Sequence, residues 1–523
     1  MKSCFADSTL SNTPFARSRN FLVRGRIPVA LAILSFATYL WAALLLHQQN
    51  QGGGAYIIER SSLAAAVSNV VYGAPLGAVF SEILTSFLTF VTPIDILIEQ
   101  LAGGAAPSRL ASVVQDGTGL GYVVLATLAM HIFGPRLSAI IWLYFIFVAI
   151  SALAFLWRYR DERLVALPLY FSSLTIMLFT PLTSNPVYLA QSAVGGIRYF
   201  SLLGILPALH IFLDLVETRD TNIPGRWPDL VTLGIQVIIL VLAILIRNST
   251  GIFMVALALT WVVAAWIHRR DIALLRRTLF KGAYVTLLSA VVVGALMLSL
   301  PNYVREGRIG SVFWHRVFIS LGLHPEWPFG NMRERYDCTK YIEEGIGVGG
   351  SDRTGHCIWL VYAMEHNIPE NKWIEGVYGD LYETALRQAF LEVLRTYPRQ
   401  VLETLFWYKP PMIVASIKES LTFDLSGFSN LQIFLLVASI GIALVFGISS
   451  SVYWWSPGFL LLMGATMMFA TFSTIPYLVA WALPSTTADL LFFCLFALGL
   501  VASMTIATIF RSFRPRSLDR TPE

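Results

Sequence analysis

The amino-acid sequence predicts an all-α polytopic membrane protein with about 10–12 transmembrane helices and a mainly helical segment outside the membrane. Three observations predict this class. Only 13% of the 523 residues are charged, well below the share expected of a soluble globular chain, whereas 56% are hydrophobic. The hydrophobic residues are gathered into runs about long enough to cross a hydrocarbon layer of ~30 Å. Clusters of arginine adjoin these runs.

The positions of the arginine clusters predict the orientation of the chain. Cytoplasmic loops of membrane proteins carry an excess of Lys and Arg. We therefore expect both termini to be cytoplasmic, together with the four regions that hold the clusters: 17–26, 158–163, 269–281 and 511–516. Because every cluster adjoins a hydrophobic run, the net charge of +5 does not indicate a nucleic-acid partner. We therefore expect the arginine clusters to lie at the membrane surface.

The hydrophobic runs can be traced through the membrane under this rule. The expected crossings are 28–47, 138–157, 166–181, 199–216, 228–246, 252–267, 284–300, 433–448, 454–471 and 490–510. When segment 301–431 lies outside, the three crossings that follow it return the C-terminus to the cytoplasmic side. The domain organisation is then a membrane domain at 1–300, a periplasmic segment at 301–431, and C-terminal membrane helices with a basic tail at 432–523.

The first external loop, 48–118, leaves two interpretations open. Residues 75–95 and 119–133 either form two further spanning helices or lie as interfacial or re-entrant helices on the external face. Glu82, Asp95 and Glu99 make 75–99 a poor spanning helix.

The 301–431 segment has one clear element and one candidate cross-link. Helical spacing of apolar residues predicts a helix over 380–397, in which Asp380 and Glu383 resemble a capping box. We expect a loop over about 322–379, and 406–411 as a return to the membrane surface. Cys338 and Cys357 are a disulfide candidate for an oxidising compartment, with two free thiols as the alternative.

The first external loop also holds the carboxylates considered for catalysis. The sequence contains no nucleotide-binding loop, nucleophile elbow or metalloprotease motif in a usable context. Three interpretations are open for each of Glu59, Glu82, Asp95, Glu99 and Asp116: a general base, a metal ligand or an ordinary solvated residue. Asp116 stands in a Gly-rich turn directly before an apolar helix, whose N-terminus favours a negative charge.

Basic and aromatic residues form the candidate substrate-binding set. Arg198 and Arg247 fall at the external ends of membrane helices, where they bind lipid phosphate or extend to the headgroups. Residues 313–330 combine His315, His324 and Glu326 with several aromatic side chains, a mixture suited to a sugar or a prenyl headgroup. An amphipathic surface helix is the plainer interpretation. The spacing fits no standard metal motif, so no metal site is predicted.

Two stretches resemble a known group of enzymes. Residues 116–135 resemble the start of the second helix in polytopic GT-C-type glycosyltransferases, which include the protein O-mannosyltransferases and the aminoarabinose transferases. Residues 313–330, followed by the helix at 380–406, resemble a segment of bacterial membrane proteins grouped with these enzymes. The order of a short inner N-terminus, an acidic first loop and a larger later external segment is also similar to theirs.

The resemblance implies a GT-C-like fold and a defined reaction. Such enzymes transfer a sugar, with inversion, from a polyprenyl-phosphate donor to an acceptor at the outer face of the bacterial inner (plasma) membrane. The first-loop base would be Glu59 or Asp116, and the donor phosphate would be held by Arg198, Arg247 and Lys409. The partners would be the lipid-linked sugar and a glycan or lipid acceptor. The resemblance implies no specific cofactor and leaves open whether the enzyme needs a divalent cation, Mg²⁺ or Mn²⁺.

Two other functions compete with the transferase. A lipid or polysaccharide transporter (or flippase) would carry ionisable groups within its helices, and the predicted helix interiors are nearly free of charge, Asp214 standing near a helix end. A non-catalytic partner in envelope assembly would keep the same fold. Under the transferase interpretation, the 301–431 segment forms a lid over a site made by membrane helices and residues 48–120.

Overall fold

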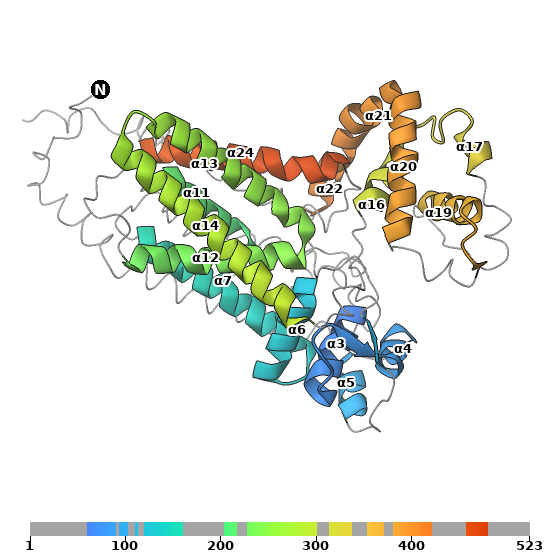
Figure 1. Ribbon diagram of the computed structural model, residues 1–523, viewed down its shortest axis with the longest axis horizontal. Coiled ribbons are helices and arrows are strands. Elements are labelled where there is room, and N and C mark those ends of the chain that lie inside the picture. Colours follow the sequence, from blue (N-terminus) through green and yellow to red (C-terminus); the bar gives the residue numbers. More distant parts are fainter. Residues whose placement is uncertain are drawn as a thin grey trace, which may run out of the picture.

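The computed structural model describes the following residues: 60–89, 94–102, 110–112, 120–159, 203–216, 227–300, 313–336, 353–370, 380–420 and 457–479. These residues are mostly helical, with two short strands (Figure 1). They form a helical bundle, a small unit at 60–112 and a helical unit at 313–420. The crossings predicted at 28–47, 166–181, 433–448 and 490–510 lie outside the described residues.

Apolar helices at the predicted places make up the bundle. They are α6 (Leu120–Phe133), α7 (Leu137–Tyr159), α11 (Ile205–Val216), α12 (Trp227–Ile246), the short η4 (Asn248–Gly251), α13 (Ile252–His268), α14 (Ile272–Ser299) and α24 (Pro457–Val479). The predictions for α7, α12 and α13 agree with these limits to within two residues. Helix α14 begins twelve residues before the predicted start at 284 and so includes part of an arginine cluster.

Three of these helices are long and apolar enough to cross a membrane, over Trp142–Tyr159, Trp227–Ile246 and Ile272–Ser299. The outward faces of α13 and α14 are apolar, with Val255, Val262 and Leu287 more than half exposed. In water such faces would be costly, whereas lipid covers them without cost. The described part of the chain is therefore mostly helical and compatible with an all-α membrane protein.

Glycine allows two pairs of bundle helices to approach closely. A Cβ atom on Gly282 of α14 would lie 2.2 Å from the indole ring of Trp261 of α13. A Cβ atom on Gly121 of α6 would lie 2.5 Å from the backbone carbonyl carbon of Leu245 of α12. The start of α6 therefore packs directly on the C-terminal end of α12.

The unit at 60–112 replaces the spanning helix that one interpretation placed at 75–95. It contains α3 (Arg60–Tyr72), β1 (Ala78–Phe80), α4 (Ser81–Thr89), α5 (Ile94–Ala102) and β2 (Leu110–Ser112). The strands are antiparallel, with Val79 opposite Ala111. Helix α4 has nine residues, and α6, with fourteen, is about 21 Å long. Residues 75–95 therefore do not form one continuous spanning helix, whereas a crossing by α6 stays a prediction, because residues 113–119 before it lie outside the described part of the chain.

The unit at 313–420 is built from helices around its own core. The elements are α16 (Phe313–Ile319), η5 (Ser320–Leu323), α17 (Met332–Arg335), α19 (Arg353–Glu365), α20 (Asp380–Thr396), α21 (Pro398–Glu403), the π-helix η8 (Thr404–Tyr408) and α22 (Lys409–Ser420). Phe318, Trp359 and Tyr382 are buried there, in a cluster distinct from the bundle core. The predicted helix at 380–397 is confirmed as α20, whereas the loop expected over 322–379 contains α19.

Candidate functional site

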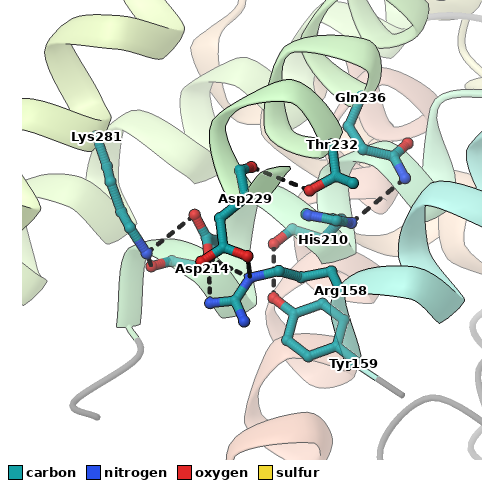
Figure 2. Close-up of polar contacts among 8 residues, drawn as sticks. All are labelled: Arg158, Tyr159, His210, Asp214, Asp229, Thr232, Gln236 and Lys281. Carbon is teal, nitrogen blue, oxygen red and sulfur yellow. Dashed lines mark hydrogen bonds and ion pairs between the residues drawn. The ribbon is translucent and has the colours of Figure 1, made fainter. Parts of the chain in front are cut away.

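Four charged side chains from four helices meet at one end of the bundle (Figure 2). Arg158 comes from the last turn of α7, and Asp214 from the last turn of α11. Asp229 comes from the first turn of α12, and Lys281 from α14. We call these residues the charge cluster. Helices α7 and α11 end at this level and α12 begins there, while Lys281 lies in the third turn of α14.

Asp214 is the centre of the charge cluster. Its Oδ1 accepts hydrogen bonds from Arg158 Nη2 at 3.0 Å and Nε at 3.2 Å. Its Oδ2 lies 2.9 Å from Lys281 Nζ, which also donates to the Asp214 backbone carbonyl at 2.7 Å. Asp229 Oδ1 is 3.8 Å from Arg158 Nε and is more exposed to solvent. Only 2% of the Asp214 side chain is exposed, so both ion pairs are withdrawn from water.

A polar network continues from the charge cluster into the bundle. Gln236 donates from its amide nitrogen to the Ser151 carbonyl at 2.8 Å and accepts from the Ser151 hydroxyl at 2.7 Å. The same amide nitrogen lies 3.3 Å from His210 Nδ1. Because an amide nitrogen can only donate, we assign the ring proton of His210 to Nε2. Phe155 and Tyr159 pack edge-on against this ring.

Three members of the charge cluster lie in terminal turns, as expected for Asp214, whereas Lys281 lies inside α14. Arg158 and Lys281 are part of the arginine-rich clusters that set the predicted orientation, yet both side chains turn inward to Asp214. The sequence signal for this arrangement is Asp214 itself, because a carboxylate in an apolar helix needs a buried basic partner. Chemically, the cluster can fix four helices in register or move charge, but it presents no nucleophile paired with a base.

The predicted catalytic residues Glu59 and Asp116 lie outside the described residues, as do Arg198 and Cys338. Arg247 follows α12 and is half-buried, with its backbone N–H donating to the Ala243 carbonyl at 2.9 Å. It lies at the end of α12 opposite the charge cluster. Asp229 and Leu245 stand sixteen residues apart on that helix, which corresponds to about 24 Å.

His315 is buried inside the 313–420 unit. Its Nδ1 lies 2.6 Å from the Tyr382 hydroxyl. The two carboxylate oxygens of Glu383 accept from the backbone N–H groups of Trp314, at 2.7 Å, and His315, at 3.1 Å. The predicted capping box of α20 is therefore corrected, because Glu383 caps α16 instead. Burial raises the pKa of the Glu383 carboxyl, and the two amide donors partly offset that rise.

His324 contacts a different face of the same unit. Its Nδ1 accepts from the backbone N–H of Glu326 at 3.1 Å, so the ring proton lies on Nε2, 3.4 Å from the Glu403 carboxylate. Arg399 donates to Glu403 at 2.7 Å and, as the largest influence, lowers the pKa of that carboxyl. The ring of Tyr408 packs edge-on against His324.

Lys409 joins the 313–420 unit to the bundle. Its ammonium donates to the backbone carbonyl of Leu478, near the end of α24, at 2.6 Å. Only 1% of the residue is exposed, and burial lowers the pKa of its amine to about 7. Ile413 packs on Tyr477 beside this contact.

The predicted substrate-binding residues thus lie in separate places. His315 contacts Tyr382, His324 contacts Glu403 and Tyr408, and Lys409 contacts the Leu478 carbonyl. Arg247 follows a bundle helix. Cys357 of α19 is disulfide-bonded. Within the described ranges, no group of three or more His, Cys, Asp or Glu side chains is placed to hold a metal ion.

Comparisons with known proteins add no relative to this description. No protein-family model, no curated protein and no solved structure matches the chain.

Proposed function

We propose that the chain is a membrane glycosyltransferase that transfers a sugar from a polyprenyl-phosphate donor to a glycan or lipid acceptor of the bacterial envelope, at the outer face of the inner membrane. One observation carries the proposal. The 60–112 unit, which follows Glu59 directly in the chain, packs on the bundle beside Leu300, at the end of α14 remote from Lys281 and the charge cluster. A transferase of this kind needs its acidic first loop fixed at the end of the bundle where the donor phosphate lies.

Two contacts fix the unit at that end. Ala64 and Ala65, among the small and fully buried residues of α3, lie in the same core as Tyr122 of α6. Small residues let membrane helices approach closely. Leu76 packs against Leu300, the residue that follows α14. The described residues of the first loop therefore pack on the bundle.

Covalent geometry limits how far the proposed base and phosphate ligand can lie from each other. Asp116 is five residues before Gly121, so it lies within about 18 Å of it along any path of the chain. Gly121 packs on Leu245, and Arg247 follows two residues later. In the proposed reaction Arg247 binds the donor phosphate, and the base takes the proton of the acceptor hydroxyl.

The disulfide and the arginines support the orientation. Disulfides persist in oxidising compartments such as the periplasm, and Cys357 belongs to the unit expected outside. Arg269 and Arg270 are exposed at the opposite end of the bundle, as the positive-inside rule requires of the cytoplasmic side.

Donor consumption tests the proposal directly. Purified full-length protein in nanodiscs is incubated with labelled polyprenyl-phosphate sugars and an acceptor glycolipid, and release of polyprenyl phosphate is measured. Loss of a general base slows transfer by about 10²–10⁴-fold, so either Glu59→Gln or Asp116→Asn should show that loss. Glu99→Gln is the matched control, because Glu99 is an exposed acid of the same unit.

Two outcomes contradict the proposal at different levels. If both variants keep full activity, the base is wrongly assigned although the reaction stands. If folded wild-type protein consumes none of the donors, the chain is not a transferase of this kind, and the non-catalytic assembly partner becomes the better interpretation.

The charge cluster favours a second candidate, a lipid or polysaccharide transporter. Ionisable residues inside membrane helices commonly mark transport pathways, and Asp214 and Lys281 are both buried there. If the chain is a transporter, vesicles that contain the wild-type protein should move labelled lipid-linked glycan across the bilayer, and vesicles that contain Asp214→Asn should not. Neither protein should consume the donor. If Asp214→Asn still consumes the donor, the charge cluster has a structural role and not a role in transport.

A further inference from the structure

The turn between α13 and α14 carries exposed cations that the proposed transferase does not use. Arg269 and Arg270 form the turn, and Arg276 lies one helical turn into α14. All three side chains are exposed, and no residue in the described ranges forms an ion pair with any of them. We call this segment, residues 266–281, the α13–α14 hairpin.

The carboxylate of the hairpin is already engaged. Asp271 accepts hydrogen bonds from the backbone N–H groups of Ala273, at 3.0 Å, and Leu274, at 3.2 Å, and so caps α14. Arg269, Arg270 and Arg276 carry three exposed positive charges against the single negative charge of Asp271, an exposed excess of two positive charges. Such an excess attracts an anion.

Contacts between α13 and α14, and one ion pair to α11, hold the hairpin in one shape. His268 Nδ1 lies 2.9 Å from the Thr278 hydroxyl, and the indole N–H of Trp261 donates to the Thr278 carbonyl at 3.1 Å. Lys281 is tied to Asp214 within the charge cluster. The arginines therefore project from a fixed scaffold, and ordering the hairpin adds little to the cost of binding.

Exposed apolar side chains stand beside the arginines. Trp266 is 62% exposed, Ile267 60% and Ile272 80%. The Arg269 guanidinium lies 4.8 Å from the centre of the Trp266 ring. Tryptophan beside arginine, at the end of two apolar outward faces, is the composition of a helix end at headgroup level. The occupant must therefore offer a phosphate next to an acyl chain.

We propose that the α13–α14 hairpin is a binding site for anionic phospholipid. Arg269, Arg270 and Arg276 bind the phosphodiester, since guanidinium pairs with phosphate oxygens through two parallel hydrogen bonds. Trp266, Ile267 and Ile272 contact the upper part of the acyl chains. A zwitterionic lipid is disfavoured because its amine brings a positive charge to an already positive site. The site is independent of whether the chain transfers sugars.

Thermal unfolding of the full-length protein in detergent tests the site, because a ligand that binds only the folded state raises the unfolding midpoint. Dioleoyl-phosphatidylglycerol should raise the midpoint, whereas dioleoyl-phosphatidylcholine at the same concentration should not. In R269Q/R270Q/R276Q the shift should disappear, with affinity about fivefold weaker for each arginine removed. Arg399→Gln is the matched control: Arg399 is 85% exposed but already paired with Glu403.

Three results would overturn the proposal. They are an equal midpoint shift with phosphatidylcholine, a shift that persists in the triple variant, and a shift that inorganic phosphate alone reproduces. The midpoint without added lipid reports whether the triple variant folds. If it does not fold, Arg270→Gln and Arg276→Gln give the same comparison singly, and each must weaken the lipid response by about fivefold for the site to stand.

Discussion

Asp214 is the residue on which the bundle interior depends most. Its carboxylate pairs with both Arg158 and Lys281, whose side chains are 9% and 5% exposed. Removing one partner of a buried ion pair commonly costs about 3–5 kcal/mol, because it leaves an uncompensated charge. We expect Asp214→Asn to lower the free energy of unfolding by this amount, measured by thermal or denaturant unfolding in detergent. Asp229→Asn should cost less than about 1 kcal/mol, since Asp229 is partly exposed and 3.8 Å from its partner.

Lys409 makes stability depend on pH. Its pKa is about 7 in the folded protein and 10.5 for an ordinary lysine, so between these values the unfolded chain binds one proton more. Stability therefore rises with pH from about 7 to 10, by up to ~1.4 kcal/mol per unit, and this contribution is flat below pH 7. Lys409→Met should lack this rise when unfolding midpoints are measured across pH 6–10. Equal pH profiles for the two proteins would contradict the assignment.

At the scale of elements, the contact between α13 and α14 rests on one glycine. Gly282→Ala places a methyl group against the Trp261 ring and should cost about 1–3 kcal/mol, measured by unfolding in detergent. Gly294→Ala, in the same helix with nothing within 4 Å, should gain about 0.5–1 kcal/mol. Trp261→Leu should restore part of the loss in Gly282→Ala. Failure of this rescue would show that the two residues do not oppose each other.

The elements show where sequence patterns suffice and where they do not. A run of apolar residues fixes a helix whatever surrounds it, because its backbone groups must bond to one another in lipid. The limits of α12 and α13 follow from that rule. Residues 75–95 and 353–365 have mixed composition, so their state depends on packing partners distant in sequence. Glu383 illustrates the same limit, since the helix that it caps is about seventy residues away in the chain.

At the scale of the whole molecule, the orientation can be measured by labelling. In a background with Cys4→Ser and Cys494→Ser, a cysteine introduced by Arg399→Cys should react with a membrane-impermeant maleimide in spheroplasts. One introduced by Arg270→Cys should react only after permeabilisation. Arg399 and Arg270 are both exposed, so the two introduced cysteines should differ in their access to the maleimide only through the side of the membrane on which they lie. Labelling of both on the same side would contradict the predicted topology.

Composition and charge clustering by themselves determined the class, because burying apolar runs in lipid is a local property of each run. They also located most of the described bundle helices and the 313–420 unit. Only the tertiary structure decided that Arg158, Asp214 and Lys281 meet, that Lys409 is buried, and that the 60–112 unit packs on the bundle. Each of these depends on which helix ends come to the same level and the same side. That arrangement follows from packing between segments far apart in the chain, which no local pattern records.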